Sequence, residues 1–240
     1  GVELNLDEEL LKLNREGRRD IASKAESLGL ELPSLCTGLF WKYNLASPDE
    51  SVRRRGIEIL KTACQFASDI GAKVVLVVPA VAVPDLSYQE TWELSRRSIT
   101  EAIPAAEEHD VYLGIENVWN KFLYSPLEFR RFIEEFNHPN VRAYFDVGNT
   151  QFLGFPHQWI RHLSNLIVSV HVKDFRAIGW SSIRFGPLLT GDVQWPLVMK
   201  ALREVGYDGY LTVEVSPYPG DPVKSAIDNK TALDIIFKMT

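Results

Sequence analysis

Cysteine is scarce in this chain of 240 residues, which contains only Cys36 and Cys64. The two thiols form no Cys-x-x-Cys pair and no cluster with histidine. This argues against a structural zinc site and against a disulfide framework. Two separate thiols suit a reducing compartment, so we expect a cytoplasmic protein.

Long apolar runs and basic runs are also missing. No apolar stretch approaches the ~20 residues that span a bilayer, and the N-terminus has no secretory signal pattern. The formal net charge is -6, whereas nucleic-acid binding depends on Lys and Arg that neutralise phosphates. We therefore expect no membrane partner and no nucleic-acid partner, but a small-molecule ligand.

Short apolar runs are what the sequence does contain, and each is followed by a helix-like stretch. The runs are Val2–Leu6, Leu30–Thr37, Lys73–Ala80, Val111–Val118, Val141–Val147, Leu166–Asp174 and Tyr210–Ser216. Most are rich in Val, Ile, Leu or aromatic residues. Nearly continuous apolar runs are typical of parallel strands that are covered on both faces.

Helical patterns fill the intervening segments. The ranges are Ser51–Ile70 before Gly71, Glu90–His109, Ser125 to about Asn137, Trp195–Val205 before Gly206, and Asp221–Met239. Ser125 followed by Pro126 predicts a helix start, because Ser caps well and Pro suits the first turn. Pro104 predicts a kink or a break in the second of these helices.

Repeated strand–helix units predict a parallel sheet with right-handed crossovers. We expect one domain over residues 1–240, an α/β (β/α)8 TIM barrel. Only seven strand runs are found, so the first strand–helix unit is expected to precede Gly1. An open doubly wound sheet is the alternative, disfavoured because no Gly-rich phosphate loop follows an early strand.

Four strand ends carry a polar residue that apolar packing does not require, namely Glu116, Asp146, His171 and Glu214. Side chains alternate along a strand, and all four occupy the phase that we assign to a barrel interior. Barrel enzymes place their chemistry at the carboxyl ends of strands. Three carboxylates meeting there would repel one another unless a cation neutralised them. The set therefore predicts one divalent metal ion, and its ligand types suit Mn, Mg, Co or Zn.

Each residue taken alone also has a plain structural interpretation. Glu116 could be a buried salt-bridge partner, Asp146 could cap the next helix, and His171 could be a hydrogen-bonded core histidine. Their common phase on four strands favours the metal site over these three separate explanations.

With its motifs in view, the chain resembles the sugar phosphate isomerase/epimerase superfamily of xylose-isomerase-like barrels, along essentially its whole length. This superfamily includes ketose 3-epimerases, L-ribulose- and L-xylulose-5-phosphate 3-epimerases and inosose dehydratases. The motifs are Tyr-Phe-Asp146-Val-Gly-Asn149, Val-His171-Val-Lys-Asp174, Thr-Gly-Asp192-Val-Gln-Trp195 and Val-Glu214. The start, Gly-Val-Glu-Leu-Asn-Leu-Asp-Glu, is similar to the family's second strand.

The resemblance implies that Glu116, Asp146, His171 and Glu214 bind the metal, and that Glu116 and Glu214 form the acid/base pair. It also implies a metal-dependent isomerase that forms dimers or tetramers. Tagatose-type 3-epimerases differ at three substrate positions, where this chain has Asn149, Phe122 and Ala177. These departures favour the phosphosugar branch over free ketoses.

Several reactions fit the same four residues: epimerisation, aldose–ketose isomerisation, or inosose-type dehydration. A non-catalytic sugar-binding barrel is a further alternative. An endonuclease for abasic DNA is disfavoured, because only one histidine lies on a strand and the chain is acidic. Further candidates for substrate binding at the same strand ends are Asn149, Lys173, Asp174, Arg176 and Trp119, and Lys121 or Arg184 could contact a phosphate.

Overall fold

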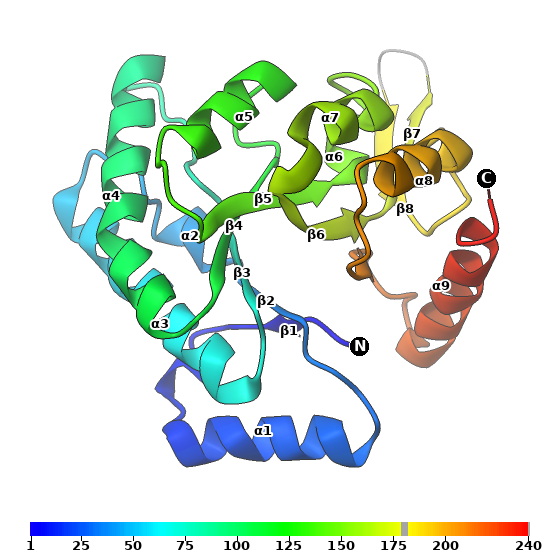
Figure 1. The fold of residues 1–240 in the computed structure, drawn as a ribbon, viewed down its shortest axis with the longest axis horizontal. Coiled ribbons are helices and arrows are strands. Elements are labelled where there is room, and N and C mark those ends of the chain that lie inside the picture. The colour runs from blue at the N-terminus through cyan, green and yellow to red at the C-terminus, as the bar shows by residue number, and fades with distance from the viewer. Residues whose placement is uncertain (179–181, 240) are drawn as a thin grey trace. The chain divides into compact units, whose positions relative to one another are not determined.

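The computed structural model describes residues 1–178 and 182–239, which form two compact units, Gly1–Tyr144 and Phe145–Thr240 (Figure 1). We call these the N-terminal and C-terminal units. Seven strands make one sheet in the order β1-β2-β3-β4-β5-β6-β9. The strands are β1 (Leu4–Asn5), β2 (Ser34–Cys36), β3 (Val74–Val77), β4 (Tyr112–Glu116), β5 (Val141–Asp146), β6 (Ile167–Val172) and β9 (Leu211–Val213). Each strand lies within one of the expected apolar runs.

Helices separate the strands of the N-terminal unit. They are η1 (Leu10–Lys12), α1 (Arg15–Ser27), α2 (Leu39–Lys42), α3 (Glu50–Ile70), α4 (Tyr88–Glu108) and α5 (Pro126–Glu134). Figure 1 shows α3 and α4 side by side, and α1 also packs against α3. Strand pairing in this unit is parallel throughout, which confirms the alternating strand–helix plan.

Local sequence signals fix the ends of these helices. The Asp49 side chain caps α3, and Gly71 ends it at φ 82, a left-handed conformation that favours glycine. Ser125 and Glu128 form a capping box at the start of α5, with a Pro in its first turn. Of the kink or break expected at Pro104, the break does not occur, since α4 continues through that residue, and the kink stays a prediction.

The sheet of the N-terminal unit is curled, and three polar side chains show this. Tyr144 of β5 donates a hydrogen bond to Glu3, and the Ser34 hydroxyl donates to the same carboxylate oxygen at 2.5 Å. Neighbouring strands lie about 4.8 Å apart, so a flat sheet would hold β1 and β5 far beyond hydrogen-bond reach. Tyr144 is fully buried. The phase of Tyr144, which is also that of Asp146, therefore faces the concave side.

The C-terminal unit contains α6 (Val147–Thr150), α7 (Pro156–Leu163), η2 (Ser164–Leu166), α8 (Trp195–Glu204) and α9 (Pro222–Ile236). In this unit α7 packs against α8, and α8 against α9. Strands β6 and β9 pair in parallel. Across the described residues, no helix is both long and apolar enough to cross a bilayer.

A second, two-stranded sheet departs from the expectation. The run from Leu166 was expected to continue as one strand to Asp174, but β6 ends at Val172. Asp174 instead begins β7 (Asp174–Ile178), which pairs in antiparallel fashion with β8 (Ser182–Gly186). The change of direction follows from Asp174, whose carboxylate accepts the N–H groups of Phe175 and Val193 and ties the start of β7 to the approach to α8.

Candidate metal centre

Three of the expected ligands belong to the C-terminal unit, and each lies at the carboxyl end of a strand. Asp146 is the last residue of β5, and His171 is the last but one of β6. Glu214 directly follows β9, and its N–H donates to Val172 O at 3.1 Å, which extends the pairing of β9 with β6 by one residue. Parallel pairing brings these strand ends to the same edge of the sheet.

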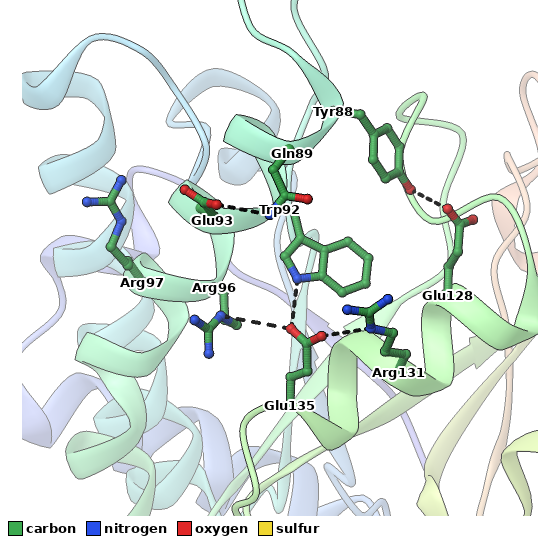
Figure 2. A pocket seen from close by; sticks show the side chains of 9 residues that line it. All are labelled: Tyr88, Gln89, Trp92, Glu93, Arg96, Arg97, Glu128, Arg131 and Glu135. Carbon is green, nitrogen blue, oxygen red and sulfur yellow. Dashed lines mark hydrogen bonds and ion pairs between the residues drawn. The ribbon is translucent and has the colours of Figure 1, made fainter.

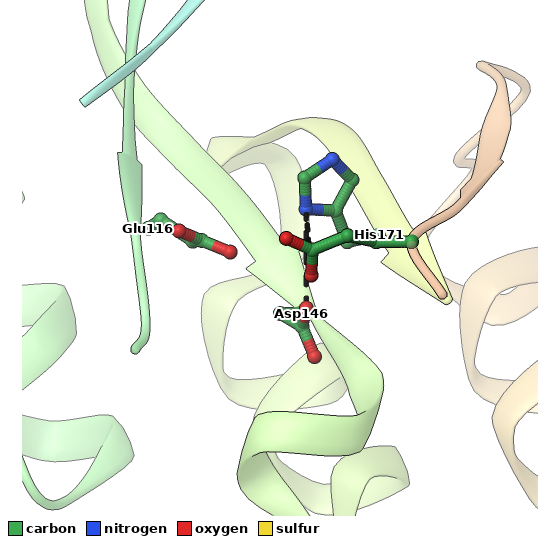
Figure 3. A group of neighbouring side chains, drawn as sticks. Glu116, Asp146 and His171 are labelled. Atoms are coloured by element: carbon green, nitrogen blue, oxygen red, sulfur yellow. Dashed lines mark ion pairs between the residues drawn. The ribbon is translucent and has the colours of Figure 1, made fainter. Parts of the chain in front are cut away.

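The three side chains converge. His171 Nδ1 lies 3.9 Å from Asp146 Oδ2 and 3.7 Å from Glu214 Oε2 (Figure 3). One ligand atom from each residue lies within 4.8 Å of the others. Asp146 and His171 are buried, whereas the Glu214 side chain is 51% exposed. The donor set of two carboxylate oxygens and one imidazole nitrogen fits a divalent cation such as Mn, Mg, Co or Zn.

A lysine ammonium also contacts this cluster. Lys173 Nζ lies 2.7 Å from Asp146 Oδ2 and forms a second ion pair with Glu214, and its side chain is only 9% exposed. A buried carboxylate needs a compensating positive charge, and Lys173 provides one. The sequence suggested Lys173 only as a substrate contact. Lys173 follows the end of β6, so strand alternation gave no signal for these ion pairs.

Asp146 performs two tasks at once. Its Oδ1 accepts the N–H of Asn149 at 2.7 Å and so caps α6, while its Oδ2 faces Lys173 and His171. The helix-cap interpretation and the ligand interpretation are therefore compatible, because a carboxylate has two oxygens. Asn149 itself is buried, and its backbone serves the cap.

Glu116 and Trp119 belong to the N-terminal unit. Glu116 is the last residue of β4 and is 5% exposed. Its strand partner in β5 is Tyr144, two residues before Asp146. Trp119 follows β4 and is 40% exposed. Phe122 is buried and packs against the rings of Tyr88 and Trp92.

The remaining candidates lie on the β7–β8 hairpin. Asp174 is buried, and besides two backbone N–H groups it accepts the indole N–H of Trp195 at 3.2 Å. These bonds give Asp174 a structural task. Arg176 and Arg184 are exposed on β7 and β8.

A hollow of about 490 Å³ lies between α4 and α5 of the N-terminal unit, and the residues that line it do not include the candidate metal ligands (Figure 2). Its polar groups bind one another. Glu135 accepts the Trp92 indole N–H at 2.8 Å and the Arg131 Nε–H at 2.8 Å, and Tyr88 donates to Glu128 at 3.1 Å. Burial raises the pKa of Glu135, but the bonds from Trp92 and Arg131 outweigh that effect and lower it overall. The volume of this hollow therefore does not make it the candidate catalytic site.

Comparison with known families agrees with this geometry. A sequence model described as "Xylose isomerase-like TIM barrel" matches residues 1–233. The chain belongs to this family. The expected (β/α)8 fold class is thereby confirmed. Solved structures with a similar fold include a xylose isomerase domain protein from Planctomyces limnophilus, with a TM-score of 0.82 and 23% identity, covering 99% of this chain and 87% of that one.

Similar sequences include L-ribulose-5-phosphate 3-epimerase UlaE of Escherichia coli O1:K1. It is 29% identical over 224 residues, which are 89% of this chain and 76% of the relative. A solved L-ribulose 3-epimerase shares the fold with a TM-score of 0.81 and 20% identity, over 98% of this chain and 83% of that one. These relatives are epimerases, enzymes of the isomerase class.

Proposed function

We propose that this protein is a divalent-metal-dependent epimerase of a ketose or ketose phosphate. The convergence of Asp146, His171 and Glu214 at the carboxyl ends of three strands carries the proposal. Sequence similarity to L-ribulose-5-phosphate 3-epimerases supports the substrate class.

Glu116 is proposed as the fourth metal ligand. It is buried at the end of β4, the neighbour of the strand that ends in Asp146. The IOLI protein, which shares the fold, was solved with a bound zinc atom; its TM-score is 0.81 at 18% identity over 99% of this chain and 88% of that one. The metal of the present chain is proposed to be one of Mn, Mg, Co or Zn.

Proton transfer is assigned to Glu116 and Glu214. A divalent cation held by these residues would polarise the substrate carbonyl as a Lewis acid and so acidify the neighbouring C–H. One glutamate removes that proton and the other returns a proton to the opposite face, which inverts one carbon. Lys173 holds the Glu214 carboxylate in place through its ion pair. Asn149, Asp174, Arg176 and Trp119 are retained as substrate-binding proposals.

Hydrogen exchange with solvent provides the direct test. The protein is incubated with Mn and with ketoses, ketose phosphates or inososes in D2O, and deuterium uptake is located by NMR. Uptake at the carbon next to the carbonyl, with formation of the epimer, is the expected result. Loss of water from an inosose would instead indicate the dehydratase alternative. No exchange and no turnover with any of these compounds would refute the enzyme and leave the sugar-binding barrel.

Compartment and assembly are part of the same proposal. Both cysteines are free, as suits a reducing cytoplasm. Assembly as a homodimer or homotetramer remains a prediction, checked by light scattering after gel filtration.

A further inference from the structure

Two arginines oppose each other on the β7–β8 hairpin. Arg176 and Arg184 are direct partners in the antiparallel register, and both are exposed. Side chains in such a position lie about 5 Å apart at Cβ, and like charges there destabilise the pair. Over residues 1–178 and 182–239, no carboxylate forms an ion pair with either guanidinium. Both groups are exposed, so water and dissolved ions screen this repulsion, and an anion bound between the two arginines would remove it.

The two arginines line a hollow of about 320 Å³ together with Phe175, Phe185 and the 186–191 loop. This volume is at the lower end of small-ligand pockets, which span roughly 300–1,000 Å³. Asp174 also borders the hollow, but its oxygens are engaged by Phe175 N–H, Val193 N–H and the Trp195 indole. These hydrogen bonds occupy the carboxylate of Asp174, so the charged groups that the hollow offers to a ligand are the two guanidinium groups.

The loop lies close against the hairpin for a steric reason. A Cβ on Gly191 would come within 2.4 Å of both Asp174 Oδ1 and Phe175 O, so only glycine permits this approach. Asp192, the next residue, donates its N–H to Phe175 O and accepts the Ala177 N–H. The hollow is thus held between a bonded loop and the hairpin, within the C-terminal unit.

The hairpin contacts the metal cluster through one side chain. Lys173 Nζ lies 5.0 Å from the centre of the Phe185 ring, a cation–π distance, and 2.7 Å from Asp146 Oδ2. Phe185 lines the hollow and Asp146 belongs to the cluster. Lys173 and Phe185 therefore connect the hairpin to the cluster.

We propose that Arg176 and Arg184 bind the phosphate monoester of a ketose phosphate whose carbonyl end lies at the metal cluster. This inference rests on the proposed function and narrows its substrate class to phosphorylated ketoses. A phosphate dianion neutralises both cations, and the planar guanidinium matches two phosphate oxygens at once.

Inorganic phosphate is the first probe. Its affinity is measured by calorimetry at low ionic strength for the wild type, for Arg176→Gln, for Arg184→Gln and for the double variant. Each single change should weaken binding about tenfold, and the double change about a hundredfold, because hydrogen bonds to charged groups have such magnitudes. Arg19→Gln, which removes an exposed arginine of α1, is the matched control and should bind as the wild type does. Absence of phosphate binding by the wild type, or full binding by the double variant, overturns the inference.

A conservative variant guards against misfolding. Arg176→Lys with Arg184→Lys keeps both charges but loses the bidentate geometry, so it should bind phosphate with intermediate affinity. Equal circular dichroism spectra for all variants are required before affinities are compared. Loss of binding in the double lysine variant to the level of the double glutamine variant would contradict a charge-based site.

Deuterium exchange then separates the two proposals. With Mn present, the double glutamine variant should show at least a tenfold higher KM for ketose phosphates, whereas its KM for free ketoses should rise much less, because they carry no phosphate. Exchange from ketose phosphates at the wild-type KM would refute the arginine site and leave the epimerase intact. If the wild type exchanges no ketose at all, the epimerase proposal fails, while phosphate titration still decides the fate of the arginine site.

Discussion

Glu116 and Glu214 have different surroundings although both are proposed to move protons. Glu116 is 5% exposed, whereas the Glu214 side chain is 51% exposed and paired with Lys173. A carboxylate can bind a cation through one oxygen and keep the other for a proton. Two such groups in unlike environments suit the removal of a proton from one epimer by one residue and from the other epimer by its partner.

Glu116→Gln and Glu214→Gln should each lower turnover by about 10²–10⁴-fold, because general acid–base groups contribute that much. The amide keeps one oxygen ligand, so some metal should be retained. One variant should exchange deuterium from only one substrate epimer. Steady-state kinetics and NMR measure both effects, with the exposed Glu93→Gln as control. Near-normal turnover in both variants would show that the glutamates are ligands only.

Cys64 predicts a loss of stability at high pH. Burial in α3 raises the pKa of its thiol to about 12 from the ordinary 9.0. The unfolded chain therefore releases this proton first, and stability falls as the pH rises from 9 towards 12. This thiol should lower the free energy of unfolding by about 1 kcal/mol at pH 10. Urea unfolding at pH 7.5 and pH 10 measures it, and Cys64→Ala should lose less stability between the two than Cys36→Ala. Equal losses would contradict the assignment.

At the scale of elements, the strands and the longer helices were predictable, whereas the β7–β8 hairpin was not. Buried strands such as β3, with Val74–Val77, leave an apolar run that sequence reading detects. The helix start at Ser125 and the helix end at Gly71 could be predicted, because helix caps favour particular residues. The β7–β8 hairpin escaped because it depends on Asp174 bonding to Val193 and Trp195, residues distant in sequence.

The candidate site follows the same division. Strand phase alone placed Asp146, His171 and Glu214 together, as the structure has them. Lys173 between Asp146 and Glu214 depends on side-chain conformation, which periodicity does not encode. The exposure of Glu214 depends on β9 ending at Val213 rather than continuing to Ser216.

Gly148 joins α6 to the site by close approach. A Cβ there would lie 2.5 Å from Lys173 Cγ and 2.9 Å from Lys173 O. Gly148→Ala should therefore displace Lys173 and destabilise the fold by about 1–3 kcal/mol, as overpacking does. Turnover should also fall, because Lys173 holds Asp146 and Glu214. Gly38→Ala is the control, since nothing lies within 4 Å of its added Cβ. Unchanged stability in Gly148→Ala would contradict the packing argument.

For the whole molecule, metal binding should be linked to stability. A ligand that binds only the folded chain stabilises it by about 2.7 kcal/mol at a hundred times its Kd. Adding Mn or Zn should raise the Tm, and chelation should reverse the rise. Asp146→Ala should abolish tight binding and this shift.

Two further variants isolate the ligand role of Asp146. Asp146→Asn keeps an oxygen that can cap α6 but removes the charge, so it should fold and still bind metal poorly. Asp208→Ala, at an exposed position after α8, should bind one ion as the wild type does. Undiminished binding by the Asp146 variants would remove it from the site.

The hydrogen bond between Tyr144 and Glu3 joins residues that are 141 positions apart in the chain. Contacts of such long range carry a loop-closure cost and tend to form after local structure. We therefore expect the curl of the N-terminal strands to be completed late in folding. Tyr144→Phe should then accelerate unfolding while leaving the refolding rate of the full chain almost unchanged. In stopped-flow measurements, loss of this bond would thus shorten the lifetime of the native state without slowing its formation.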